Sequence, residues 1–365
     1  MPYEGLPPHG PRRDKDKNRM RLDQVGELAL LDWIRKRAGD KREKGKGLLL
    51  GIGDDAAAFK LAGKNGKTAL ATQDLMAEGV HFDLRYFTPY QLGFKLVSVN
   101  VSDIYAMGGA PRLALFAIAA PPETEAAFIK KIFEGVFAAL DLYGARLAGG
   151  DLSASRSGLV LDMSVIGEAA KVIRRAGAKP GDGVFVTGPL GDSACGREIL
   201  KRIARPLPIG RATGGGRKKE KISGLLPGWL DWETVKPLVT RHLMPVAKKP
   251  PKRASAMLDV SDGLLIDAFR LCKESGVGVK IYEEKIPVSK QMRRAAGALG
   301  MDPLAIAKIG GEDYELLYTA PIGPRGEKSN DGGILIGEIV PSGFYMVEAS
   351  GKMKRFRPEG YRHFN

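Results

Sequence analysis

Strand-like and helix-like patterns alternate along this chain in two successive blocks, and this alternation constrains the fold more than any other feature. In the first block, strand patterns lead into a long helical pattern over 89–107, and after Glu168 a strand pattern over 183–187 begins the second block. Such alternation is typical of α/β domains, and 365 residues can form two cores. We predict an α/β fold with mixed sheets and two domains, 25–168 and 169–365.

The remaining elements follow from the same periodicities. Two strands joined at Asn65-Gly66 form a predicted hairpin, because Asn-Gly is a strong signal for a tight hairpin turn. Residues 1–24 are Pro-rich with mixed charge and predict a loose tail, and residues 205–228 are rich in Gly, Pro and Lys and predict an exposed insertion. The other predicted strands cover 57–61, 68–72, 113–119, 159–166 and segments near Asp259, Leu317 and Leu335, and the other helices cover 28–37, 123–143, a segment from Ser193 and one ending near Lys273.

Composition excludes several classes of protein. A hydrophobic content of 44% with 27% charged residues is that of a globular protein, and the apolar stretch 113–121 is too short to span a bilayer. The N-terminus has no apolar signal core, so we expect a cytoplasmic protein. Cys195 and Cys272 are 77 positions apart in helical patterns, which predicts buried free thiols in a reducing compartment.

The net charge of +15 comes largely from three basic clusters, in 35–46, 197–221 and 248–253. Aromatic residues do not alternate with these lysines and arginines, as they would on a surface that stacks single-stranded nucleic acid. We therefore expect solvated loops and no nucleic-acid partner, with polyanion binding as an alternative.

A phosphate-binding loop of the Walker type is absent. Gly66-Lys67-Thr68 resembles the end of such a loop, but the position of the required earlier glycine is Leu61. A nucleotide would therefore have to bind in another way.

Acidic residues gather at predicted glycine turns and strand ends. Each one alone is most simply a turn or cap residue, and Ser261 or Asp262 could cap the helix that follows. Together, oxygen ligands without nearby Cys or His favour magnesium, which commonly serves phosphate substrates. The set comprises Gly51–Asp55, Asp74, Asn100 with Asp103, Gly149–Asp151, Asp259–Gly263 and Gly310–Glu315.

Two features could bind the phosphates themselves. Arg175 could act as a clamp, and the helix that begins after Gly188–Ser193 could offer its free N–H groups to an anion. A structural arginine and an ordinary helix start are equally compatible with these sequences.

From about residue 25 to the C-terminus, the motifs and their order resemble the thiamine-monophosphate kinases of the aminoimidazole-ribonucleotide-synthetase superfamily. The most specific motifs are GIGDDAA, NVSD, SDGL and GGEDYEL in this order, while EGVHF and the terminal GYRHF are typical of the kinases within the superfamily. The matching stretches are 51–59, 78–82, 93–112, 147–151, 174–182, 186–196, 258–267, 309–321 and 360–364.

The resemblance implies an N-terminal domain that binds ATP and forms a homodimer through its sheet, together with a C-terminal α/β domain. It implies transfer of a phosphoryl group from ATP to thiamine monophosphate, assisted by several magnesium ions. It implies catalytic roles for Asp55, Asp103, Asp151 and Arg175. It implies that ATP is bound by Gly150, Asp151, Arg175 and Ser261. His81, Glu312 and Tyr361 would hold the thiamine substrate. The metal positions would be Asp55, Thr72, Gln73, Asp74, Asp103, Asp151, Asp259 and Asp262.

The expected chemistry needs no side-chain nucleophile. The acceptor phosphate is largely ionised at neutral pH, so the enzyme has to screen two anions from each other and align them in line. Gln73 and Leu152 stand where the family usually has Thr, and both lie beside predicted metal positions, which leaves the number of metal ions open.

Two other functions compete with this prediction. One is a sister enzyme of the superfamily that acts on another phosphorylated or acyl substrate, although a selenophosphate synthetase is excluded because the N-terminal segment has no Cys. The other is a polyanion-binding protein on the same scaffold, which the predicted cluster of carboxylates argues against.

Overall fold

The structure is a computed structural model that describes residues 29, 48–50, 53–60, 66–204, 230–322 and 332–363. The predicted tail over 1–24, the insertion over 205–228, the helix over 28–37 apart from Ala29, and Gly51-Ile52 lie outside the described residues. Residues Lys41–Tyr361 form one compact unit, to which everything below belongs.

The first part of this unit is a six-stranded mixed sheet. Its strands β2 and β3 pair antiparallel as the predicted hairpin requires, while β4 and β5 run parallel. In sheet order the strands are β1 (Leu48–Leu50), β2 (Ala57–Lys60), β3 (Thr68–Ala77), β6 (Val160–Ala169), β4 (Ala110–Ala120) and β5 (Arg146–Ala154).

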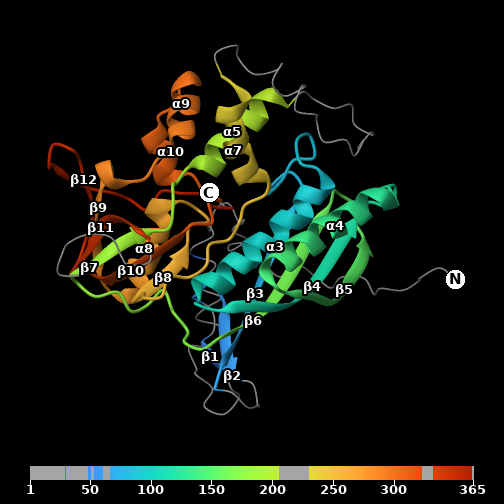
Figure 1. Cartoon of the computed structure of the whole chain (residues 1–365), viewed down its shortest axis with the longest axis horizontal. Coiled ribbons are helices and arrows are strands. Elements are labelled where there is room, and N and C mark those ends of the chain that lie inside the picture. The colour runs from blue at the N-terminus through green and yellow to red at the C-terminus, as the bar shows by residue number, and fades with distance from the viewer. Residues whose placement is uncertain are drawn as a thin grey trace, which may run out of the picture. The chain divides into compact units, whose positions relative to one another are not determined.

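Helices α3 (Pro89–Ala106) and α4 (Ala126–Tyr143) cover one face of this sheet (Figure 1). Thr88 and Gln91 form a capping box at the start of α3, so both residues satisfy backbone N–H groups that the first turn leaves unpaired. Gly144 in the left-handed conformation ends α4. The buried side chains of the two helices and of the covered sheet face form the core of this half.

Two glycines allow α3 and α4 to approach each other closely. A Cβ at Gly93 would lie 2.0 Å from the carbonyl oxygen of Ile132, and a Cβ at Gly135 would lie 1.9 Å from that of Tyr90. We expect Gly93→Ala to destabilise the fold by about 1–3 kcal/mol, because the helices would have to separate. Chemical unfolding measures this effect, and Gly297→Ala in helix α9 (Lys290–Ala298) is the matched control, since its Cβ would meet no atom within 4 Å. Equal stability of both variants would contradict the close packing.

The second part is a seven-stranded mixed sheet with further helices. In sheet order its strands are β13 (Met353–Arg355), β12 (Phe344–Val347), β9 (Gly278–Tyr282), β11 (Ile334–Val340), β7 (Asp182–Val186), β10 (Leu316–Pro321) and β8 (Ala256–Asp259). Its helices are α5 (Asp192–Ile203), α7 (Trp232–Leu243), α8 (Leu264–Ser275), α9 (Lys290–Ala298), α10 (Pro303–Ile309) and the short 3-10 helix η2 (Glu283–Lys285).

These elements confirm the predicted α/β fold with mixed sheets and correct two details. The strand that begins at Thr68 extends to Ala77, so Asp74 lies inside it and not at its end. Gly149-Gly150-Asp151 lies within β5 and not in a turn. Cys195 and Cys272 are buried free thiols as predicted. None of the helices among the described residues has the length and apolar character needed to cross a membrane.

Candidate active site

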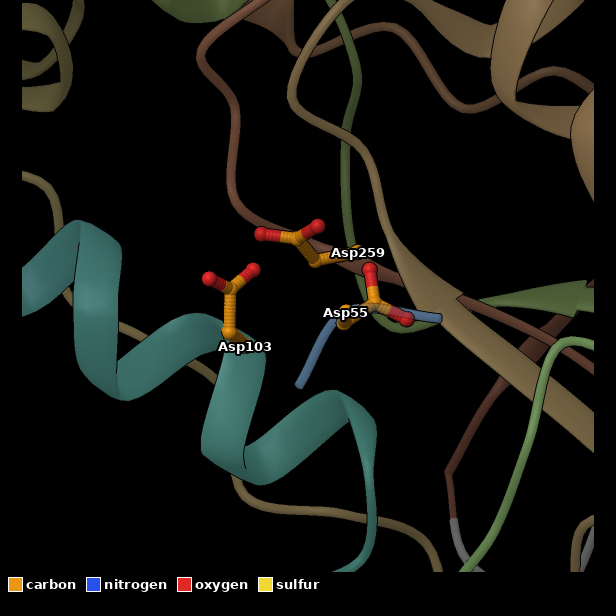
Figure 2. A group of neighbouring side chains, drawn as sticks. All are labelled: Asp55, Asp103 and Asp259. Carbon is orange, nitrogen blue, oxygen red and sulfur yellow. The ribbon is translucent and has the colours of Figure 1, made fainter. Parts of the chain in front are cut away.

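Three carboxylates from distant parts of the sequence are neighbours in Figure 2. Asp55 lies just before β2, Asp103 lies in the last turn of α3, and Asp259 ends β8. Their nearest oxygen atoms all lie within 4.8 Å of one another. Among the described residues, this is the group whose geometry could hold a metal ion.

Neighbouring hydroxyl groups hold two of these carboxylates in place. Thr72 on β3 donates from Oγ1 to Oδ2 of Asp103 at 2.5 Å, and Ser102 on α3 donates to Oδ2 of Asp259 at 2.6 Å. The predicted metal position Thr72 therefore contacts the trio, and Ser102 is a contact that the sequence reasoning missed. Its adjacency to Asp103 in NVSD is the only sequence signal that could have revealed it.

The cluster is electrostatically strained. Burial raises the pKa of Asp103 well above its usual value, and the nearby carboxylates of Asp74, Asp259 and Asp55 raise it further. Burial and Asp55 likewise raise the pKa of Asp259. Burial, followed by repulsion from Asp162 and Asp55, raises the pKa of Asp74 to about 6. Four carboxylates this close together require a compensating positive charge.

A small divalent cation fits this donor set. Magnesium prefers oxygen ligands at about 2.0–2.1 Å, so opposite ligands of one ion lie about 4.2 Å apart. The 4.8 Å limit within the trio is close to that span. Asn100, one turn before Asp103, also has a buried Oδ1 without a hydrogen-bond partner among the described residues.

Arg175 supplies part of the compensating charge. Its guanidinium donates from Nη2 to Oδ1 of Asp55 at 2.8 Å and from Nε to Oδ2 at 3.2 Å. Its backbone is fixed independently, since its N–H donates to Oδ1 of Asp54 at 2.6 Å and its carbonyl accepts from Ser275 at 2.9 Å. The predicted phosphate clamp therefore lies against the carboxylate trio.

Two predicted metal positions lie on the other face of the first sheet. Gln73 donates from Nε2 to both carboxylate oxygens of Asp162, at 2.9 and 3.0 Å. Asp151 on β5 is in register with Ala117, which is in register with Asp162, so these residues lie on the face opposite α3. The structure does not bring Gln73 or Asp151 into the trio, and their roles remain predictions.

Gly150 allows β5 to lie close to β4. A Cβ at this position would lie 1.8 Å from the carbonyl oxygen of Phe116. Glycine is therefore required by packing, and the predicted contact with ATP remains untested.

The two acidic turns of the second half pack directly on each other. The N–H of Glu312 donates to the carbonyl of Ser261 at 2.7 Å, and the N–H of Tyr361 donates to the carbonyl of Asp262 at 3.0 Å. A Cβ at Gly311 would lie 2.4 Å from the carbonyl oxygen of Ser261. Main-chain contacts thus hold together four residues that the sequence assigned to ATP, metal and substrate, namely Ser261, Asp262, Glu312 and Tyr361.

The start of α8 differs from the predicted cap. The N-cap is Gly263 without a side-chain bond, and neither Ser261 nor Asp262 caps the helix. Asp267 in the first turn accepts instead from the N–H groups of Asp262 and Gly263, each at 3.0 Å. Oδ2 of Asp262 accepts from Arg270 at 2.5 Å, so its predicted metal role is untested.

The start of α5 already binds an anion from the protein. The carboxylate of Asp313 accepts from the N–H of Gly191 at 2.5 Å and from that of Ser193 at 3.1 Å. Because Asp313 occupies these two donors, the structure favours the ordinary helix start over the phosphate site, the two alternatives that the sequence left open.

His81 lies in the turn after β3. Its Nδ1 accepts from the N–H of Ala77 at 3.0 Å, which leaves the proton of the neutral ring on Nε2. The ring orientation is thus fixed by its own turn, and its predicted contact with the thiamine substrate is untested.

Lys95 on α3 and His242 on α7 are the main residues that sequence reasoning missed. Both are buried and contact the carboxylate of Glu312. The available signal was weak: Lys95 is a charged residue among the apolar positions of a helix, between Leu92 and Leu96.

Comparisons with known proteins show what this chain is similar to. Residues 53–169 match the family model "AIR synthase related protein, N-terminal domain". The thiamine-monophosphate kinase of Aquifex aeolicus is 34% identical over 356 residues, which cover 94% of this chain and 100% of that protein. The thiamine-monophosphate kinase of Bacillus subtilis is 34% identical over 283 residues, covering 74% of this chain and 77% of that protein.

Solved structures show the same likeness. A structure of AaThiL complexed with AMPPCP and TMP superposes with a TM-score of 0.77 at 32% identity, covering 94% of this chain and 99% of that chain. The HypE–HypF complex superposes with a TM-score of 0.58 at 19% identity, covering 90% of this chain and 99% of that chain, and shows the fold alone. Because the identity to the curated kinases exceeds 30% over most of both chains, this chain belongs to the thiamine-monophosphate kinase family.

Proposed function

We propose that this protein transfers the γ-phosphoryl group of ATP to thiamine monophosphate, giving thiamine diphosphate and ADP. The observation that supports this most directly is the convergence of Asp55, Asp103 and Asp259 beside the Arg175 guanidinium. Carboxylates arranged for hard cations next to an arginine suit phosphoryl transfer. The complex of AaThiL with AMPPCP, an ATP analogue, and TMP supports the two substrates.

Asp55, Asp103 and Asp259 would hold magnesium, with Thr72 and Asp74 beside them. When bound, magnesium supplies positive charge to the phosphate oxygens. An oxygen of the acceptor phosphate attacks the γ-phosphorus in line, and the bond between that phosphorus and the β–γ bridging oxygen breaks. No proton has to be removed, because the attacking phosphate is already ionised.

The other residues would contact the two substrates or further metal ions in this proposal. Arg175, Gly150 and Ser261 would contact ATP, while His81, Glu312 and Tyr361 would contact the thiamine part of the acceptor. Gln73, Asp151 and Asp262 would add metal contacts from outside the trio. Because ATP is the phosphoryl donor, we place the reaction in the cytoplasm.

Incubating the purified protein with ATP, magnesium and thiamine monophosphate tests the proposal directly. We expect thiamine diphosphate and ADP in equal amounts, and no product when EDTA replaces magnesium. ATP hydrolysis without thiamine diphosphate would contradict the proposed acceptor. Turnover of a different phosphorylated substrate would favour a sister enzyme of the superfamily.

Tyr361 should matter for the acceptor and much less for ATP. An aromatic ring against the cationic thiamine rings contributes about 0.5–2 kcal/mol, which corresponds to a loss of affinity of about 2- to 30-fold. We expect Tyr361→Ala to raise KM for thiamine monophosphate by that factor and to leave KM for ATP nearly unchanged, and His81→Ala to act in the same direction. Steady-state kinetics with each substrate varied measures this. A rise confined to KM for ATP would remove Tyr361 from the acceptor site.

We also propose that the chain forms a homodimer through the uncovered face of its first sheet. Leu75, Leu113 and Leu115 lie on β3 and β4 and are 49%, 43% and 44% exposed. Leucines this exposed on a sheet face are typical of an interface. Light scattering after gel filtration should give twice the mass of one chain, and Leu115→Lys should lower the measured mass toward that of a single chain.

A further inference from the structure

The Glu312 carboxylate has a buried partner on each of its oxygens. Lys95 Nζ lies 2.7 Å from Oε1, and His242 Nδ1 lies 3.2 Å from Oε2. The side chains of Lys95 and His242 are each only 1% exposed, whereas that of Glu312 is 22% exposed. Two buried groups therefore hold the carboxylate, and part of the Glu312 side chain remains exposed to solvent.

Aromatic side chains surround the two partners. The Lys95 ammonium lies 5.3 Å from the centre of the Phe87 ring, which itself lies 5.4 Å from the ring of His242. The Tyr86 ring lies 6.2 Å from that of His242. These rings leave little freedom to the two side chains, and in an apolar surrounding a lysine needs a counter-charge. Glu312 supplies it.

The protonation states agree with this geometry. Burial alone would raise the pKa of Glu312, but Lys95 and His242 outweigh it and hold this pKa below its usual value. Burial, with Lys95 nearby, lowers the pKa of His242 to about 4, and Arg197 on α5 acts in the same direction. At neutral pH, Glu312 is therefore ionised, and the neutral ring of His242 can donate from Nδ1 to its carboxylate, while Oγ of Ser193 lies 3.3 Å from the same nitrogen.

The backbone conformation of Glu312 is unfavourable by itself. Glu312 has φ of 65° and Tyr314 has φ of 51°, the only non-glycine residues with positive φ among those described. A side chain in the left-handed region is unfavourable unless other contacts fix it. The two contacts to the Glu312 carboxylate, together with its N–H bond to Ser261, provide such contacts.

We propose that Lys95 and His242 are positioning residues that orient the Glu312 carboxylate toward the cationic organic part of the phosphate acceptor. This inference rests on the proposed function, which assigns Glu312 to the acceptor site. The charge of Lys95 keeps Glu312 ionised and fixes one oxygen, and the donor of His242 fixes the other. A carboxylate fixed in this way is ready to accept hydrogen bonds from a ligand without first losing rotational freedom.

The test is steady-state kinetics of Lys95→Met and Glu312→Gln, alone and combined, with each substrate varied. We expect Lys95→Met to raise KM for thiamine monophosphate at least about tenfold while kcat and KM for ATP stay within about threefold of wild type. In the Glu312→Gln background, Lys95→Met should have little further effect, because it acts through that carboxylate.

The His242 position provides an independent arm of the experiment if Lys95→Met does not fold. His242→Leu removes the donor and should raise KM for thiamine monophosphate, whereas His242→Asn keeps a donor near Nδ1 and should restore much of the affinity. The matched control is Arg241→Met, which breaks the buried ion pair with Glu315 next to His242. It should lower the melting temperature without a selective change in KM for thiamine monophosphate.

The possible results separate the two proposals. Wild-type KM for thiamine monophosphate in both Lys95→Met and His242→Leu, equal rises of both KM values, or additive effects in the double variant would overturn the positioning role. A wild-type protein that makes no thiamine diphosphate would instead overturn the proposed function, and this inference with it.

Discussion

Asp103→Asn should reduce turnover by at least about 1000-fold, which corresponds to about 4 kcal/mol of lost transition-state stabilisation. Asp103 belongs to the carboxylate trio, and asparagine has nearly the same shape without the charge that binds a cation. Because asparagine can still accept the hydrogen bond from Thr72, the helix and its neighbours should keep their positions. Turnover at saturating and at limiting magnesium measures the effect, and wild-type activity at low magnesium would contradict the metal role.

The same substitution should make the metal-free protein more stable. The folded-state pKa of Asp103 lies well above its usual value of 3.8, because burial and neighbouring carboxylates disfavour its charge. A raised carboxyl pKa costs stability above the folded-state pKa, and the cost disappears as the pH falls toward 3.8. In EDTA at neutral pH we therefore expect Asp103→Asn to melt at least about 3 °C higher than wild type. The gain should shrink as the pH falls, and magnesium should stabilise only the wild type strongly.

Arg175→Met should lower kcat/KM for ATP by about 100- to 1000-fold, a loss of roughly 3–4 kcal/mol. Its guanidinium donates to both oxygens of Asp55 and would face the phosphates of ATP. The loop should stay in place, because Asp54 and Ser275 hold the backbone of residue 175. Initial rates with ATP varied at saturating acceptor measure the effect.

Arg175→Lys is the informative companion variant. Lysine keeps the positive charge but cannot form the two-pronged contact with a carboxylate, so we expect it to recover less than about a tenth of the lost activity. Full activity of Arg175→Lys would show that only charge matters. Surface Arg112→Met is the control, since Arg112 is exposed and pairs with Glu168 on the first sheet.

The sequence alone determined the class of fold and predicted the three carboxylates that lie together in the candidate site. Strand and helix periods are local properties, so the helix over Pro89–Ala106 could be predicted closely, and the antiparallel pairing of the two strands before it could be predicted as well. The acidic residues at glycines predicted a site for hard cations, and the order of the motifs predicted the family. Three of the predicted metal positions, Asp55, Asp103 and Asp259, do lie together.

The strand that begins at Thr68 was predicted to end too early, so the sequence could not show on which face of the sheet its last residues lie. Asp74 lies inside β3 with its side chain toward α3, and its neighbour Gln73 points to the opposite face and binds Asp162. Since side chains alternate along a strand, adjacent metal candidates in the sequence necessarily face apart. The register with β6 was needed to see this.

Tertiary structure also decided which polar groups satisfy each other. Asp313 occupies the N-terminus of α5 from 122 positions away, and Lys95 reaches Glu312 across 217 positions. Burial forces such pairs because an unpaired charge in a core is costly, but the choice of partner depends on how distant segments pack. The sequence therefore determined the chemistry of the side chains that could form the site, and the packing of α3 and α7 around Glu312 determined how they are held.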